Sequence, residues 1–164
     1  MQTANWAMHG FATELGTLLR FLPVLGAVLY FAKPKMWTLA IPIIAMIAFW
    51  AHPEGRAAWY FALYWTIPLL AYPFSKKFIF ARALGATFTQ HSIGGALWIW
   101  ALHTRAPVWI GLIPIVWKER LLMAIGITLT ALAMNVILER LQKKTHDRLP
   151  ITLLPKQTIE HAHQ

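Results

Sequence analysis

Long runs of apolar residues follow one another along the chain, separated by short segments that carry charge, proline or glycine. The runs extend over residues 11–32, 36–51, 57–74, 83–102 and 121–141. A membrane-spanning helix needs about 17–25 apolar residues, and every run except 36–51 meets that length. Apolar and polar residues do not alternate as they would along a strand. The pattern predicts an all-α protein, a polytopic transmembrane helical bundle with five spanning helices.

Residues 108–117 form a further apolar run that is too short to span and ends at a charged segment. We expect a short interfacial or re-entrant helix there, although six spans are possible. Lys and Arg collect on the cytoplasmic side of membrane proteins, so their positions test the two counts. With five crossings and an external N-terminus, the basic residues that fall inside are Lys33, Lys35, Lys76, Lys77, Arg82, Arg140, Lys143, Lys144, Arg148 and Lys156. Those that fall outside are Arg56, Arg105, Lys118 and Arg120, and this asymmetry favours five crossings.

Composition agrees with the membrane interpretation. Apolar residues make up 58% of the chain and charged residues 13%, whereas an ordinary soluble domain has about 25% charged residues. The net charge of +9 is explained by cytoplasmic loops, so no nucleic acid is expected as a partner. We expect a transmembrane domain over residues 1–141 and a polar cytoplasmic tail over 142–164. The predicted location is a bacterial or archaeal cytoplasmic membrane.

A few polar side chains fall inside the apolar runs. Ionisable groups at membrane depth are costly and usually face a bundle interior or a cavity. Arg20 lies in the first run, Gln90 and His91 lie in the middle of the fourth, and Glu119 stands just before the fifth. We expect Arg20 to pair with Glu119 or with Glu14, closing one wall of an outward-facing cavity.

Four residues of the fourth run recur at helical spacing: His91, Gly94, Gly95 and Trp98. One side of this helix would therefore offer a hydrogen-bonding ring, a gap and a large aromatic side chain. Such a composition is typical of a pocket for a small ring-containing molecule, with Gln90 beside it. Close packing of a neighbouring helix against the two glycines uses the same residues and is the alternative.

The stretch Thr-Phe-Thr-Gln-His-Ser-Ile-Gly-Gly-Ala-Leu-Trp at residues 87–98, followed by Pro107-x-Trp109 and a last amphipathic helix, resembles the late part of S-components of energy-coupling-factor vitamin transporters. The thiamine-type members are the most similar. The resemblance covers residues 87–120 and implies that His91 and Trp98 contact a vitamin-like ligand. It also implies a membrane coupling subunit as a partner.

The leading hypothesis is therefore a membrane protein that binds a small solute and serves as a transport component. It would have no ATPase activity of its own, because no Gly-rich phosphate loop ending in Gly-Lys-Ser/Thr is present. The alternative is a structural or assembly protein that packs against other membrane subunits. We do not expect an enzyme, a metal site or a cofactor, because the chain has no Cys, no Gly-x-Ser-x-Gly elbow and no His-Glu-x-x-His pair.

Overall fold

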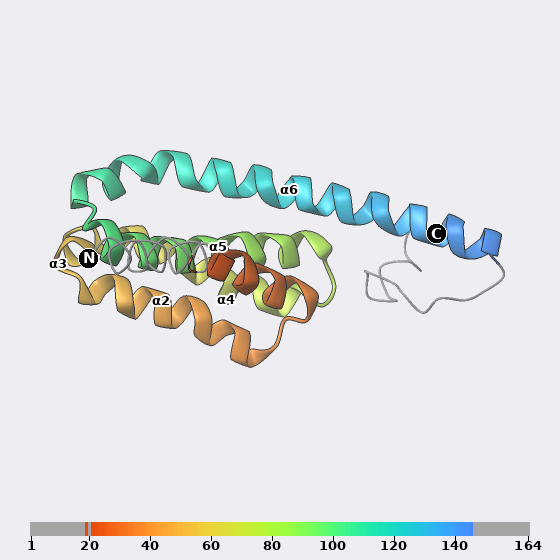
Figure 1. The fold of residues 1–164 in the computed structure, drawn as a ribbon, viewed down its shortest axis with the longest axis horizontal. Coiled ribbons are helices and arrows are strands. Elements are labelled where there is room, and N and C mark those ends of the chain that lie inside the picture. The colour runs from red at the N-terminus through yellow and green to blue at the C-terminus, as the bar shows by residue number, and fades with distance from the viewer. Residues whose placement is uncertain (1–18, 20, 146–164) are drawn as a thin grey trace, which may run out of the picture.

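The computed structural model describes residues 19 and 21–145, and this part of the chain is helical with no strand (Figure 1). The all-α prediction is confirmed. The elements in chain order are the first helix Phe21–Ala32, η1 (Met36–Leu39), α2 (Ala40–Ala51), α3 (Pro53–Ala57), η2 (Trp59–Thr66), α4 (Ile67–Ala71), η3 (Tyr72–Phe74), α5 (Ile79–Leu102) and α6 (Ala106–Thr145).

Successive segments run in opposite directions along the bundle, because its turns gather at two ends. Residues 32–36 line a common cavity with Tyr72, Lys76 and Arg82 at one end, which we name the basic end. At the other end, the far end, the rings of His52 and His103 approach through Nε2 and Nδ1 at 3.3 Å. There the Glu54 carboxylate also accepts a hydrogen bond from the backbone N–H of Ala106 at 2.7 Å. The far-end contacts join the α2–α3 turn to the turn between α5 and α6 (Figure 1).

The predicted span over residues 57–74 is built largely from 3₁₀ helix. Its buried side chains include Ala58, Phe61, Trp65, Pro68 and Ala71, mostly three residues apart, which is the repeat of a 3₁₀ helix. This tighter winding keeps one side of the segment against the bundle. The 3₁₀ rise of about 2.0 Å per residue also lengthens the segment, so that η2, α4 and η3 together extend over roughly 30 Å.

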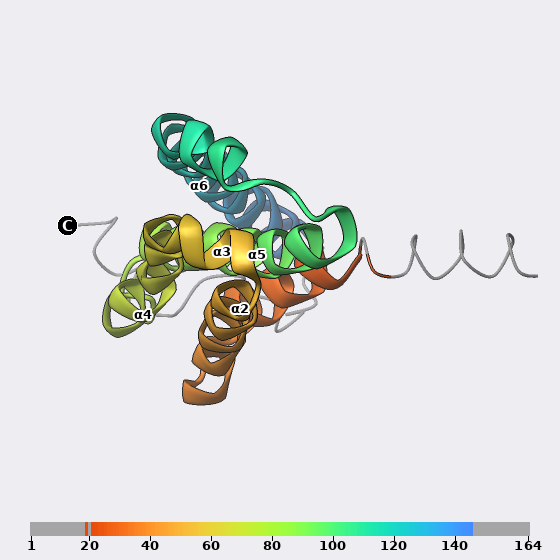
Figure 2. The same ribbon diagram turned by 90° about the vertical axis from the view of Figure 1, so that its left-hand side faces the viewer.

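Helix α5 lies in the middle of the bundle, with α2, α4 and α6 around it (Figure 2). Its buried hydroxyls are satisfied by its own backbone carbonyls: Thr89 donates to the Gly85 carbonyl and Ser92 to the Thr89 carbonyl, both at 2.8 Å. Polar residues can therefore occupy the centre of the bundle without needing partners on other helices. Gly85 admits the ring of Tyr30 against the α5 backbone.

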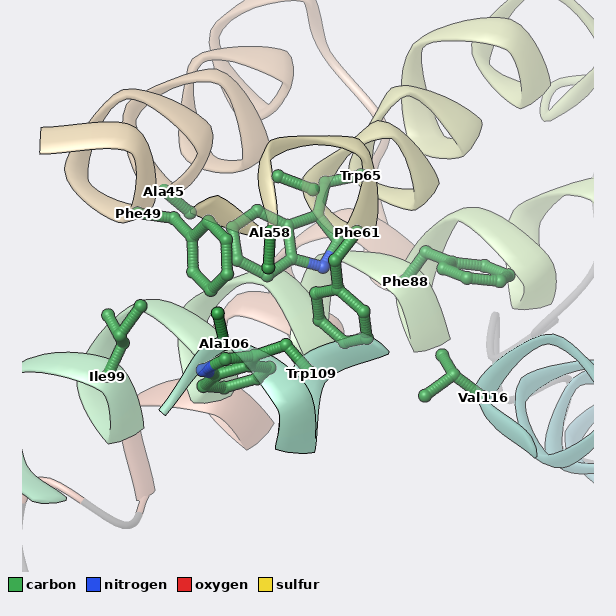
Figure 3. Close-up of a cluster of buried hydrophobic side chains, with 11 residues drawn as sticks. Ala45, Phe49, Ala58, Phe61, Trp65, Phe88, Ile99, Ala106, Trp109 and Val116 are labelled. Carbon is green, nitrogen blue, oxygen red and sulfur yellow. The ribbon is translucent and has the colours of Figure 1, made fainter. Parts of the chain in front are cut away.

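The core beside α5 is aromatic (Figure 3). Phe49 packs edge-on against Trp65 and Trp109, with ring centroids 5.2 and 5.1 Å apart, and Phe61 lies 5.0 Å from Trp109. The four rings come from α2, η2 and α6, so one cluster fixes these elements to one another near the far end.

Helix α6 differs from the prediction, because residues 108–117 are not a separate short helix. They form the first part of one continuous helix, with Pro114 inside it. The charges at Lys118, Glu119 and Arg120 resembled a boundary, but all three residue types are good helix formers, so nothing local ends the helix there. Helix α6 continues to Thr145, and the division of the chain into a transmembrane domain and a tail at residue 141 stays a prediction.

Within the described residues, Ala106–Leu141 is the segment whose length and composition suit a membrane span. Only 17% of its most apolar part is buried in the bundle. The remaining apolar helices are shorter or more polar.

Candidate functional site

The middle of α5 carries His91, and its ring faces the interior of the bundle. Its centroid lies 5.6 Å from that of Phe61 and 6.3 Å from that of Trp65, both in edge-on arrangements. The imidazole is thus enclosed on the η2 side by two aromatic rings. This environment is apolar, so any polar contact of the ring must come from another direction.

Arg120 supplies a charge on the α6 side. Its side chain is only 13% exposed. Glu119 forms an ion pair with it, with Oε1 3.3 Å from Nη2, while the Glu119 side chain is 54% exposed. The acid therefore lies at the rim and the guanidinium reaches inward.

Three of these side chains have a buried nitrogen without a hydrogen-bond partner in the described part of the chain: Trp65 Nε1, His91 Nε2 and Arg120 Nε. We name these three residues the donor cluster. The indole and guanidinium nitrogens can only donate, and the imidazole nitrogen can donate or accept. A buried donor left unpaired costs about 1–3 kcal/mol, so the cluster is suited to an acceptor such as a carbonyl, a carboxylate or water.

Gly94 and Trp98 face a different region. Together with Leu19, Pro23 and Leu97 they line an apolar cavity of about 580 Å³ at the surface, which we name the outer groove. Trp98 is 62% exposed there. The structure therefore does not bring Trp98 to the same place as His91, although both stand on α5.

Gly95 is a site of close packing. A Cβ atom added to it would lie 2.5 Å from Cζ2 of Trp65, and Trp65 is fully buried. Its lack of a side chain lets the indole approach the α5 backbone. The sequence left two roles open for the glycines, a pocket and close helix packing. Gly95 is a packing position, while Gly94 opens onto the outer groove.

Of the remaining predicted site residues, Gln90 is half-buried on α5 next to His91. Arg20 lies outside the described residues, so its predicted pairing stays a prediction, and the ion pair described for Glu119 is with its neighbour Arg120. Among the described residues, no group of three His, Asp or Glu side chains is placed to hold a metal.

Sequence reasoning did not select Trp65 or Arg120 as site residues. Arg120 had a signal, because it ends a charged triplet between two apolar runs. Trp65 had none, since one Trp among nine in an apolar run is indistinguishable from a core or interface residue.

Comparison of the chain with protein-family models, with curated proteins and with solved structures finds no match. The resemblance to vitamin-transporter S-components therefore stays a prediction from residues 87–120.

Proposed function

We propose that this chain is a polytopic integral membrane protein that binds a small solute and serves as a transport component without ATPase activity of its own. The membrane part rests on side-chain exposure. Large apolar residues are exposed on every long element, among them Phe21, Ile44, Leu70, Leu122 and Leu129, each at least 60% exposed. A protein surrounded by water rarely exposes so continuous an apolar surface, whereas hydrocarbon is its natural solvent.

Segment lengths support several crossings. The hydrocarbon core of a bilayer is about 30 Å thick. At about 1.5 Å per α-helical and 2.0 Å per 3₁₀ residue, η1 with α2 extends over about 26 Å and α5 over about 36 Å. With the first helix, the segment of η2, α4 and η3, and α6 added, the chain would cross five times.

The distribution of charge favours one orientation. Lys33, Lys35, Lys76 and Arg82 meet at the basic end, while Arg56 and Arg105 belong to the turns of the far end. The positive-inside rule then puts the basic end and the C-terminal part of α6 in the cytoplasm. The N-terminus would be external.

The donor cluster is the observation that carries the binding proposal. An ionisable pair such as His91 and Arg120 at mid-bundle depth is a functional candidate in a membrane protein. The rings of Phe61 and Trp65 offer flat apolar walls beside it. A solute suited to this place has a planar ring and an acceptor atom or negative charge. The resemblance to S-components points the same way and adds a coupling subunit as the proposed partner.

One observation favours the alternative function, an assembly protein that packs against other membrane subunits. Helix α6 is largely unpartnered within the chain, and an added Cβ at Gly111 or Gly126 would meet nothing within 4 Å. Small residues on an open helix face allow another membrane helix to approach closely. Helix α6 would then be the docking face.

Native mass spectrometry of the detergent-purified protein separates the two functions. We expect a small-molecule adduct that is lost in His91→Ala and in Arg120→Gln but retained in Lys118→Gln, an exposed neighbour on α6. An adduct that persists in the His91→Ala, Arg120→Gln double variant would contradict a solute in the donor cluster. Co-purification of membrane subunits with no small-molecule adduct would support the assembly function instead.

A further inference from the structure

The basic end carries a cavity of about 320 Å³ whose lining is unusually cationic. Lys33 and Lys35 come from the turn after the first helix, Lys76 from the turn after η3, and Arg82 from the first turns of α5. Tyr72 adds a phenol to the wall. Three separate segments thus bring four positive charges to one cavity, which we name the basic cavity.

Within the described part of the chain, no acidic side chain neutralises these charges. The ion pair found there joins Glu119 to Arg120, away from this cavity. Arg82 is held in place, because its Nε donates to the Ser75 carbonyl at 3.1 Å. That bond uses Nε of the guanidinium and leaves its two terminal nitrogens, Nη1 and Nη2, available to donate to a ligand. The three lysines are exposed. The basic cavity is therefore suited to a group with more than one negative oxygen, such as a phosphate.

Exposed apolar side chains line the cavity or neighbour its lining residues in the chain. Met36, which lines it, is 72% exposed, and its neighbour Trp37 is 53% exposed. Phe74 and Phe78, which flank the turn that carries Lys76, are 56% and 51% exposed. Exposed Trp and Phe beside a ring of cations are typical of the boundary between headgroups and acyl chains. A free phosphate ion would use the cations but not these apolar neighbours.

We propose that the basic cavity binds the phosphate headgroup of an anionic phospholipid of the cytoplasmic leaflet, with Met36 and Trp37 against its acyl chains. Basic cavities between helices on the cytoplasmic side are known to hold anionic headgroups. The proposal rests on the membrane placement given above but not on a solute in the donor cluster. Lipid binding would fix the turns at the basic end and set the depth of the bundle.

The test measures lipid adducts by native mass spectrometry of the full chain in neutral detergent, titrated with phosphatidylglycerol or phosphatidylcholine. In one variant Lys33, Lys35 and Lys76 are all changed to Gln, which removes exposed charges and keeps Arg82 in place. The matched control changes Arg56, Arg105 and Lys118 to Gln, which removes the same charge from exposed positions outside the cavity.

We expect the cavity variant to bind phosphatidylglycerol at least tenfold more weakly, since each cation near an anionic surface contributes about fivefold in affinity. The control should stay within about threefold of the unchanged protein, and phosphatidylcholine should bind all three equally weakly. Equal losses in both variants, or equal affinity for the two lipids, would overturn the proposal. Displacement of phosphatidylglycerol by inorganic phosphate at millimolar concentration would show that a free anion is the ligand.

A double variant of His91→Ala with Arg120→Gln should bind phosphatidylglycerol as the unchanged protein does. The same mass-spectrometry measurements therefore show separately whether the solute proposal fails and whether the lipid proposal fails.

Discussion

Replacement of Gly95 by Ala tests the close packing between α5 and η2. The added Cβ would lie 2.5 Å from Cζ2 and 3.1 Å from Cη2 of Trp65. The indole cannot easily move, because it is fully buried and Phe49 and Phe61 pack against it at 5.2 and 6.2 Å. Overpacking costs about 1–3 kcal/mol, and the better helix propensity of Ala offsets up to about 1 kcal/mol. We expect the free energy of unfolding to fall by about 1–2 kcal/mol.

Gly94→Ala is the matched control on the same helix. Its added Cβ would meet only Cγ of Pro23, at 3.9 Å, which is ordinary contact. This variant should be unchanged or stabilised by up to about 1 kcal/mol through helix propensity. Thermal unfolding in detergent, followed by the monodisperse fraction on size exclusion, gives both values. For a chain of this length 1 kcal/mol corresponds to about 2–4 °C in Tm. A Gly95→Ala protein as stable as Gly94→Ala would refute the packing described for Trp65.

The remaining predictions concern the two ends of the bundle. Tyr30→Phe removes the buried hydrogen bond from the phenol to the Pro68 carbonyl, 2.7 Å long, and should lower the free energy of unfolding by about 1–3 kcal/mol, read as a fall in Tm. Glu54→Ala leaves the backbone N–H of Ala106 without its carboxylate acceptor and should speed tryptic cleavage after Arg105. An unchanged cleavage rate would show that the turn is held by other contacts. Reporter fusions at the two ends of the chain should place the N-terminus outside and the C-terminus in the cytosol, and finding both ends in the cytosol would contradict five crossings.

Apolar run lengths predicted the helical class and the approximate helix positions, because burial in lipid or in a bundle demands long apolar segments. They did not predict winding: the 57–74 run has the composition of an α-helix, yet η2 and η3 within it are 3₁₀ helices. They also placed a boundary at Lys118, because a charged triplet between apolar runs usually marks water. Here the Arg120 side chain is only 13% exposed, and this burial against the bundle has no local signature in the sequence.

The candidate site could be predicted only in part. Helical spacing put His91, Gly95 and Trp98 on one side of α5, which is a property of the helix alone. Their surroundings depend on which neighbouring residues pack against each side of the helix. Trp65 packs against Gly95, while Trp98 stays at the surface. Which residue completes a cluster around His91 depends on the docking of η2 and α6, and no spacing within one run contains that information.

The polar character of α5 has a consequence for biogenesis. A helix that carries Thr87, Thr89, Gln90, His91 and Ser92 in its centre is a poor candidate for entering lipid alone, because each polar side chain raises the cost of insertion. In the folded chain Thr87, Thr89 and Ser92 are buried against neighbouring helices. In the membrane placement that we propose, α5 should therefore leave the translocon together with α2 and η2, and should be the segment whose integration fails first when an earlier helix is deleted. Glycosylation-site mapping of truncated chains during synthesis would reveal that order.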